Sequence, residues 1–341
     1  MSQVTIGGSL EYRSNEEPNW KLEIRYRKLA ILRLDSQVEC EIIQKEALDL
    51  MINRRDFIKG SAAGAATLAA AADLTRSVFA NPYGKPIGLQ LYTVREQLEK
   101  EVPGTLKKVA AIGYKEVEIY DLYGMSPAAF SKLVKDNGLT AVSGHYLLNV
   151  EKTEWEKKVA EAKELGLKYM VHAILDPPER KSLDDYKRHV ELFNKNAELS
   201  HKAGIQFCYH NHNFEFQKLD GVTVFDYLMK NLDPHLVQFE MDCFWVTHAG
   251  QDPVALMKQH PGRFPLLHIK DLKAGIGPST EFDARMGLFT EVGKGVIDWK
   301  RIFAAAPTGG MKYFFVEQDY CEIPPLESIK VSYEYLHHLT V

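Results

Sequence analysis

Cysteine is scarce in this chain of 341 residues, which contains four. No two of them are separated by only two residues, so the sequence lacks the spacing of a zinc ribbon or a thioredoxin-like redox site. Cys40 lies in the first fifty residues, whereas Cys208, Cys243 and Cys321 each lie near a predicted strand. We expect these three to be small hydrophobic side chains buried in a core.

An excess of positive charge is also missing. The chain has 42 basic and 46 acidic residues, and its acidic excess lies beyond residue 80. Nucleic-acid binding depends on Lys and Arg contacts to phosphates, so this balance argues against a nucleic-acid partner and against an endonuclease. With 45% hydrophobic and 26% charged residues, the composition is that of a soluble globular protein.

No hydrophobic run approaches the roughly 20 residues that a transmembrane helix needs. The nearest candidate, over 61–72, is rich in alanine and would insert poorly. It follows the pair Arg54-Arg55 and precedes small residues near Ala80, which is typical of a twin-arginine signal peptide. We therefore expect residues 51–80 to export the protein to the periplasm or beyond, with no membrane span after cleavage. A surface amphipathic helix is the alternative.

Residues 1–50 show neither a helical nor a strand period, and Met51 stands where a twin-arginine signal should begin. We interpret 1–50 as a leader that is non-native or disordered. An unusually long first region of the signal is the alternative. On this interpretation, the mature domain comprises residues 81–341.

Strand-like and helix-like patterns alternate from Pro86 onward. Strands are predicted at 87–91, 116–119, 141–144, 169–171, 206–209, 237–241, 265–268 and 313–316. Helices are predicted at 104–112, 127–137, 154–165, 183–203, 222–231, 253–260, 299–306 and 325–338. Glycines suited to left-handed caps follow four of these helices, at Gly113, Gly138, Gly166 and Gly204. This order predicts a single (β/α)₈ TIM barrel. A doubly wound sheet is the alternative, but the first strand lacks the glycine-rich loop of that fold.

Side chains that can bind a metal ion follow several predicted strands. The segment 206–216 places two histidines, two asparagines and Glu215 where a strand gives way to a loop. Asp242, His268 and Glu317 each stand at the end of a later strand. Because barrel strands present their carboxyl ends at one mouth, we expect these four ligands to converge. Such a set suits one divalent ion, Mn²⁺, Mg²⁺, Co²⁺ or Zn²⁺.

Each of these residues also has a structural interpretation. Asp242 could cap a following helix, His268 could be a hydrogen-bonded core histidine, and Glu317 could pair with a lysine. The same alternative applies to His145 and His172, which lie at earlier strand ends. The coincidence of four ligands at four strand ends favours a site.

Four segments together resemble the xylose isomerase-like barrel family, often called sugar phosphate isomerases/epimerases. They are residues 88–95 (GLQLYTVR), 209–216 (YHNHNFEF), 268–271 (HIKD) and 292–295 (VGKG). The resemblance covers residues 86–341. It implies a metal held by Glu, Asp, His and Glu, which we assign to Glu215, Asp242, His268 and Glu317. Relatives carry the first carboxylate nearer the strand, so His210 and His212 are rivals to Glu215.

The resemblance also implies a chemistry. A divalent ion that chelates a hydroxyl and a neighbouring carbonyl stabilises the enediolate formed when the C–H proton leaves. Glu317 is the expected base, Glu215 the second acid or base, Lys270 a positive charge near the developing oxyanion, and His145 a further catalytic candidate. Substrate contacts are expected from Gln90, Arg95, His172, His210, His212 and Trp245.

Three functions remain open on the sequence. The first is a metal-dependent sugar isomerase or epimerase. The second is a lyase, dehydratase or hydrolase acting on keto-sugars or 3-keto-glycosides. The third is a carbohydrate-binding barrel without catalysis. Export favours an environmental glycoside over a phosphorylated metabolite as the small-molecule partner, and an oligomer is possible.

Overall fold

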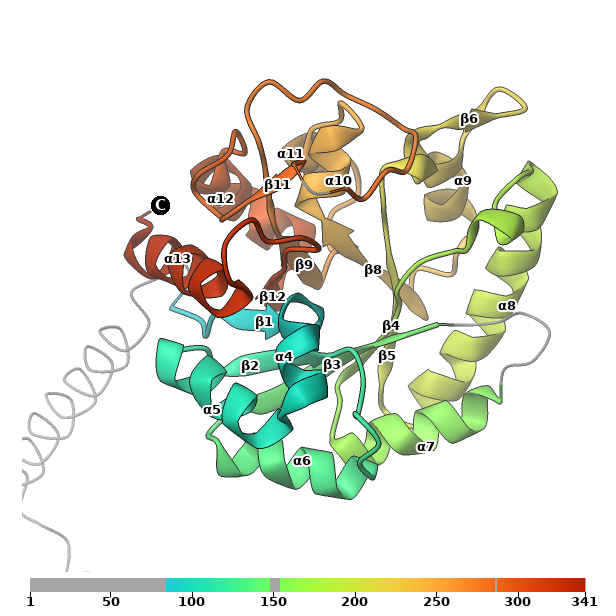
Figure 1. Cartoon of the computed structure of the whole chain (residues 1–341). Coiled ribbons are helices and arrows are strands. Elements are labelled where there is room, and N and C mark those ends of the chain that lie inside the picture. The colour runs from blue at the N-terminus through green and yellow to red at the C-terminus, as the bar shows by residue number, and fades with distance from the viewer. Residues whose placement is uncertain (1–83, 148–153, 286, 341) are drawn as a thin grey trace, which may run out of the picture. The chain divides into compact units, whose positions relative to one another are not determined.

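The computed structural model describes residues 84–147, 154–285 and 287–340 (Figure 1). The predicted leader 1–50 and signal 51–80 lie outside these residues. In the described part, eight parallel strands close into a barrel in the order β1-β12-β9-β8-β5-β4-β3-β2. Closure confirms the (β/α)₈ barrel and excludes the doubly wound sheet, which is open.

The barrel strands overlap the eight predicted ranges. They are β1 (Gly88–Gln90), β2 (Glu116–Ile119), β3 (Thr140–Tyr146), β4 (Tyr169–His172), β5 (Gln206–His210), β8 (Val237–Asp242), β9 (Leu266–Ile269) and β12 (Tyr313–Val316). Short antiparallel pairs lie outside the barrel: β6 (Lys218–Leu219) with β7 (Val222–Thr223), and β10 (Asp271–Leu272) with β11 (Phe289–Thr290).

The outer helices also follow the prediction. They are α5 (Val102–Ile112), α6 (Pro127–Asp136), α7 (Trp155–Leu165), α8 (Leu183–Lys202), α9 (Val224–Asn231), α11 (Pro253–Gln259), α12 (Trp299–Gly309) and α13 (Pro325–His338). All four predicted glycine caps have positive φ, from 71° to 128°. The sequence did not predict α4 (Arg95–Lys100), which follows β1 after the 3₁₀ turn η1 (Leu91–Val94), or α10 (Cys243–His248), which follows β8 directly. In the described residues, no helix is long and apolar enough to cross a membrane.

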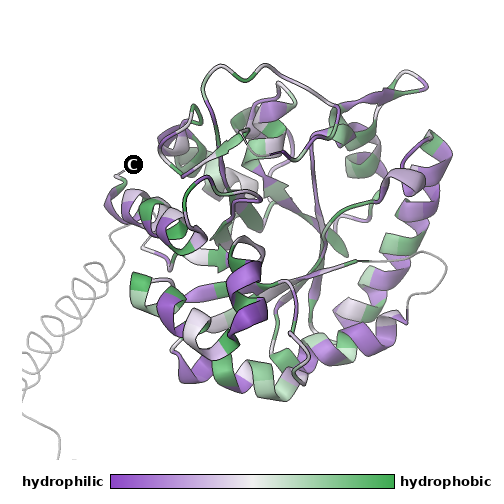
Figure 2. Ribbon diagram, viewed as in Figure 1, coloured by the Kyte–Doolittle hydropathy of each residue, from purple (hydrophilic) through white to green (hydrophobic). Residues whose placement is uncertain are grey.

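Helix α8 shows how local sequence sets these elements. Ser182 caps its start, because the Ser182 hydroxyl accepts from the Asp185 amide while the Asp185 carboxylate accepts from the Ser182 amide. Tyr186, Val190, Phe193 and Ala197 then recur at intervals of three or four residues and are buried. Hydrophobic and polar residues accordingly alternate around the outer helices in Figure 2.

The barrel interior has an apolar layer beneath a polar one. The apolar layer consists of Val142, Val171, Cys208, Leu266 and Phe315, all buried. Two residues further along three of these strands stand His210, His268 and Glu317. Strand residues two apart share a face, so the polar layer lies on the same inward face. Cys208 and Cys243 are buried as expected, whereas Cys321 is half-buried.

Parallel register brings the polar groups together from distant parts of the chain. His210 pairs across the sheet with Glu240, and Asp242 pairs with His268. Gln90 lies opposite Glu118 on the other side of the barrel. The site is therefore specified by strand pairing as much as by loops.

Asp271 anchors the segment that closes the site end of β9. Its buried carboxylate accepts hydrogen bonds from the amides of Leu272, Gly293 and Ile297, at 2.9, 2.9 and 3.1 Å, and from Trp299 Nε1 at 2.9 Å. A Cβ at Gly295 would collide with this carboxylate, so the glycine in segment 292–295 permits close approach of the backbone. Residues 268–271 and 292–295, separate in sequence, thus form one structural unit.

Replacing Asp271 by asparagine should destabilise the fold by about 3 kcal/mol, because an amide nitrogen cannot accept and leaves buried donors without partners. Urea unfolding followed by tryptophan fluorescence measures this loss. Asp226→Asn, at an exposed position of α9, is the control and should change stability by less than about 0.5 kcal/mol. An equal effect of the two variants would contradict the anchoring role.

Candidate metal centre

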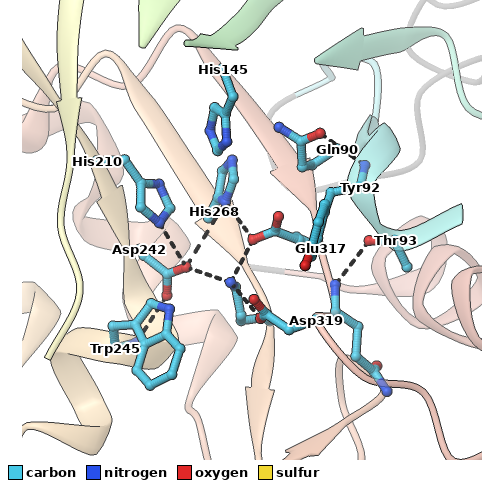
Figure 3. Close-up of polar contacts among 12 residues, drawn as sticks. Gln90, Tyr92, Thr93, His145, His210, Asp242, Trp245, His268, Glu317 and Asp319 are labelled. Atoms are coloured by element: carbon cyan, nitrogen blue, oxygen red, sulfur yellow. Dashed lines mark hydrogen bonds and ion pairs between the residues drawn. The ribbon is translucent and has the colours of Figure 1, made fainter. Parts of the chain in front are cut away.

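Asp242 is the focus of the polar layer (Figure 3). Its Oδ1 accepts from the Trp245 amide at 2.9 Å and so caps α10. Its Oδ2 is buried, and no group in the described chain satisfies it with good hydrogen-bond geometry. Lys270 Nζ lies 3.0 Å from this oxygen, His210 Nε2 3.6 Å and His268 Nδ1 3.9 Å. The cap and the site are therefore made by different oxygens of one carboxylate.

His268 is held from behind by a carboxylate. Its Nδ1 faces Asp242 and lies 2.9 Å from Glu317 Oε2, while its Nε2 lies 2.6 Å from Glu118 Oε2. Glu118 also accepts from Gln90 Nε2 at 2.8 Å. A carboxylate behind an imidazole fixes the ring and raises its basicity, as is usual at metal-binding histidines.

His210 repeats this arrangement. Its Nδ1 lies 3.0 Å from Glu240 Oε2, and its Nε2 faces Asp242 Oδ2. His145 lies between the two supporting carboxylates, with its Nε2 2.9 Å from Glu240 and 3.2 Å from Glu118. Two imidazoles, each supported from behind, thus present their second nitrogens toward the same oxygen.

Glu317 and Lys270 complete the mouth side of the cluster. Lys270 Nζ lies 2.5 Å from Glu317 Oε2 and 2.9 Å from Asp319 Oδ2, in addition to Asp242. Burial opposes ionisation of Glu317, yet Lys270 and His268 hold the pKa of its carboxyl well below the usual range. The three carboxylates also raise the pKa of Lys270 against the effect of burial. Lys270 does not pair with Asp271, its neighbour in the sequence.

The cluster contains more carboxylates than permanently charged basic groups. Glu118, Glu240, Asp242, Glu317 and Asp319 surround one lysine and three histidines. Burial raises the pKa of Asp242 to about 6 even with Lys270 beside it. Ligand atoms of Asp242, His268 and Glu317 lie within 4.8 Å of one another, and so do those of a second group, His145, His210, Glu240 and His268. An incompletely satisfied carboxylate oxygen among imidazoles fits a divalent cation.

Glu215 lies elsewhere. It is fully buried in a short 3₁₀ turn, η3 (Phe214–Phe216), and its carboxylate accepts from the Tyr209 hydroxyl and from the His212 amide at 2.8 Å. Among the described residues, it belongs to neither group of converging ligand atoms. The position expected for its carboxylate at the strand end is taken by His210, one of its two rivals. Burial raises the pKa of Glu215 to about 7.

The expected substrate contacts and two of the expected catalytic residues, His145 and Lys270, fall into two sets. His145, His210, His212 and Lys270 line a cleft of about 930 Å³ that opens above the cluster. Gln90, Arg95, His172 and Trp245 do not line it. Gln90 is held by Glu118 and by the Tyr92 amide, and Arg95 donates to the backbone carbonyls of Tyr92 and Asp319. His172 packs on Phe193 and Tyr209, and Trp245 packs on His212 and Phe282.

Successive residues of the segment 210–213 have alternating roles. His210 and His212 face the cleft, whereas Asn211 and Asn213 fasten neighbouring segments. Asn211 Oδ1 accepts from the Asp242 amide at 3.1 Å. Asn213 donates to the carbonyls of Ser279 and Glu281, at 3.0 and 2.8 Å. The long loop between β10 and β11, which arches over the upper part of Figure 1, is thereby attached at the cleft.

Sequence reasoning missed Glu118, Glu240 and Asp319. Two of them carried a usable signal, because Glu118 and Glu240 stand at inward-facing positions of strands in which polar and apolar residues alternate, EVEI in β2 and VQFEMD in β8. Glu240 precedes Asp242 by two residues, as His268 precedes Lys270 and Glu317 precedes Asp319. Pairs of polar residues spaced by two at a strand end mark one face of the strand.

The structure predicts a supporting role for Glu118 that can be measured. Glu118→Gln keeps the size of the side chain but removes its charge behind His268. The affinity for Zn²⁺ should fall about 10- to 100-fold, as measured by competition with a chromogenic chelator. Glu116→Gln, two residues earlier on the same strand, is the matched control and should leave zinc affinity unchanged. Unchanged affinity in Glu118→Gln would show that Glu118 does not support the centre.

Comparison with known proteins identifies two regions. Residues 106–337 match the family model of the xylose isomerase-like TIM barrel. Residues 51–71 match the model of the twin-arginine translocation signal, so the chain is exported by that pathway. The interpretation of 1–50 as a leader stays a prediction.

Similar proteins of known sequence include several inosose dehydratases. The protein of Geobacillus thermodenitrificans is 26% identical over 43% of this chain and 52% of its own length. The chain thus spans about half the length of the curated relatives it matches first. A relative from Klebsiella pneumoniae, also an inosose dehydratase, is 23% identical over 68% of this chain and 87% of its own length.

Solved structures show the same barrel. A sugar phosphate isomerase/epimerase from Parabacteroides distasonis is 29% identical, with a TM-score of 0.64 over 74% of this chain and 93% of its own. The IOLI protein, solved with a bound zinc atom, is 17% identical, with a TM-score of 0.59 over 74% of this chain and 98% of its own.

Proposed function

Because the chain belongs to the xylose isomerase-like TIM-barrel family, we propose that it is a metal-dependent carbohydrate enzyme. It removes the proton next to the carbonyl of a keto-sugar. The observation that carries this proposal is the buried Asp242 Oδ2, which faces His210 and His268 and accepts no well-formed hydrogen bond, with Lys270 Nζ 3.0 Å away. Zinc in the related IOLI structure supports the same assignment.

The proposed ligands are His210, Asp242, His268 and Glu317. His210 replaces Glu215 in this set because its Nε2 faces Asp242, whereas the Glu215 carboxylate is engaged by Tyr209 and His212. Two imidazoles and two carboxylates favour Zn²⁺, Co²⁺ or Mn²⁺ over Mg²⁺, which prefers oxygen ligands.

When bound, a divalent cation would polarise the substrate carbonyl and make the neighbouring C–H bond more acidic. Glu317 is the proposed base. It lines the cleft, and Lys270 and His268 keep it ionised through contacts to Oε2. No hydrogen bond from a described residue engages Oε1. That oxygen can take the proton while the C–H electron pair moves toward the carbonyl oxygen.

The fate of that proton distinguishes the candidate reactions. Return to the other face of the same carbon gives an epimer, and return to the neighbouring carbon gives an isomer. His145 and His212 line the cleft and are the candidates to return it. The inosose dehydratase relatives favour a second candidate, in which a hydroxyl on the β-carbon leaves as water after protonation. All three reactions share the first proton transfer.

Incubation of metal-loaded mature protein with keto-sugars and 3-keto-glycosides in deuterated water tests the proposal. Solvent deuterium in recovered or rearranged sugar is the expected result of reversible proton transfer. Loss of water or release of an aglycone would identify elimination. Sugar binding without exchange or cleavage of any member would contradict the enzyme and leave the carbohydrate-binding barrel.

A further inference from the structure

The cleft has room beyond the reacting sugar. Its volume of about 930 Å³ is near the upper end of the roughly 300 to 1,000 Å³ typical of small-molecule sites. Of the four proposed metal ligands, only His210 and Glu317 line it, and the converging atoms of Asp242, His268 and Glu317 lie within 4.8 Å of one another. The outer part of the cleft is therefore available to another part of the substrate.

One side of the cleft is lined by three tyrosines, Tyr92, Tyr120 and Tyr320, which we call the tyrosine wall. The rings of Tyr92 and Tyr120 meet edge to face, with 4.7 Å between their centres. Tyr92 stands beside Glu317 in Figure 3, and both line the cleft. The wall therefore extends from the proposed base to the rim.

Two of the three rings of the wall are exposed to solvent. Tyr120 and Tyr320 are 42% and 39% exposed. Of the six large hydrophobic side chains that are exposed in the described residues, three line this cleft: Tyr120, Leu147 and Tyr320. Concentration of exposed apolar rings at a cleft indicates a binding surface.

Arg95 holds the wall in place. Its two terminal nitrogens donate to the carbonyl of Tyr92 at 2.8 Å and to the carbonyl of Asp319 at 3.1 Å. Its guanidinium lies 3.9 Å from the centre of the Tyr92 ring and 6.0 Å from that of Tyr320. The segments after β1 and β12 are thus joined, and a fixed surface loses little entropy when a ligand binds.

The cleft is poorly suited to a phosphate. Two lysines line it in the described chain, Lys158 and Lys270. Lys158 pairs with Glu161 at 3.6 Å, and three carboxylates surround Lys270. Asp121 and Asp283 add negative charge to the lining. An uncharged ligand meets no electrostatic penalty here, whereas a phosphorylated sugar does.

We propose that the tyrosine wall binds the second ring of an uncharged glycoside, either a sugar or an aryl group linked to the reacting sugar. Sugar C–H faces and aryl rings both pack on tyrosine. Tyr120 and Tyr320, the exposed members of the wall, can make this contact, whereas Tyr92 lies beside the proposed base (Figure 3). The inference rests on the proposed function for the identity of the reacting ring.

The experiment measures binding, so that it does not depend on turnover. Methyl and phenyl glycosides of glucose and galactose, in both anomers, are titrated calorimetrically into zinc-loaded mature protein. For at least one pair, the phenyl glycoside should bind about tenfold more tightly than its methyl partner. Tyr120→Ala combined with Tyr320→Ala should reduce that ratio to about one without weakening the methyl glycoside. Tyr120→Phe combined with Tyr320→Phe keeps the rings and should keep the ratio.

Three outcomes would overturn the inference. They are equal binding within every pair, no binding of any phenyl glycoside up to its solubility limit, and a preference that survives both alanine substitutions. Tighter binding of glucose 6-phosphate than of glucose would refute the uncharged substrate. Tighter binding of phenyl glycosides without any proton exchange into keto-sugars would support this inference and contradict the proposed function. Proton exchange without tighter binding of phenyl glycosides would support the proposed function and contradict this inference.

Discussion

His268→Ala should remove the metal ion from the purified protein. The wild type should carry about one ion per chain after loading, whereas the variant should bind Zn²⁺ at least about 100-fold more weakly, because a ligand matters more than the carboxylate behind it. Loss of His268 also leaves Glu317 and Glu118 without the imidazole that lies 2.9 and 2.6 Å from them. Elemental analysis after gel filtration measures the bound metal, and all activity should disappear with it.

Two further variants make this result interpretable. Asp242→Asn keeps Oδ1, which caps α10, and changes only the oxygen that faces the imidazoles, so metal loss there cannot be attributed to a missing side chain. Glu215→Gln is the matched control and should retain full metal. The same assay on His210→Ala tests the fourth ligand. Metal loss in Glu215→Gln together with retention in His210→Ala would restore the ligand set expected from the sequence.

Glu317→Gln should reduce turnover by about 10² to 10⁴-fold, the usual contribution of a general base. Glutamine keeps the shape and one oxygen that can contact the metal, but it cannot accept the substrate proton. Metal content should therefore fall far less than turnover. Wash-in of solvent deuterium into the substrate, measured by mass spectrometry, should slow by the same factor as turnover.

Asp319→Asn is the control for the loss of charge around Lys270. Asp319 lies 2.9 Å from the same ammonium group as Glu317 but is not a proposed ligand or base. The Asp319→Asn substitution should reduce turnover much less than Glu317→Gln does. Near-normal deuterium exchange in Glu317→Gln would make Glu317 a ligand alone and move the search for the base to His145, His212 or Glu215.

The sequence determined the barrel and three of the proposed ligands. Alternating apolar periods and glycine caps specify which segments are strands and which are helices, and these are local properties of the chain. Asp242, His268 and Glu317 could be found because each stands at the carboxyl end of a strand, and a closed parallel barrel brings those ends to one mouth. The twin-arginine signal is likewise readable without a fold, because its order of charge, alanine and small residues is local.

The tertiary structure decided which groups share that mouth. Glu215 and His210 are five residues apart, and the sequence did not show that the chain turns after β5 so that Glu215 points back to Tyr209 and His212. Strand register likewise decided that Glu118 and Glu240 stand behind the two imidazoles. The sequence around a carboxylate in a strand does not reveal which residues lie next to it on the neighbouring strands. The tyrosine wall joins residues that follow β1, β2 and β12. Tyr320 stands at least 200 positions after the other two and meets them only because the barrel closes. Local patterns fix the elements, whereas burial, ion pairing and the choice of ligand depend on contacts between distant segments.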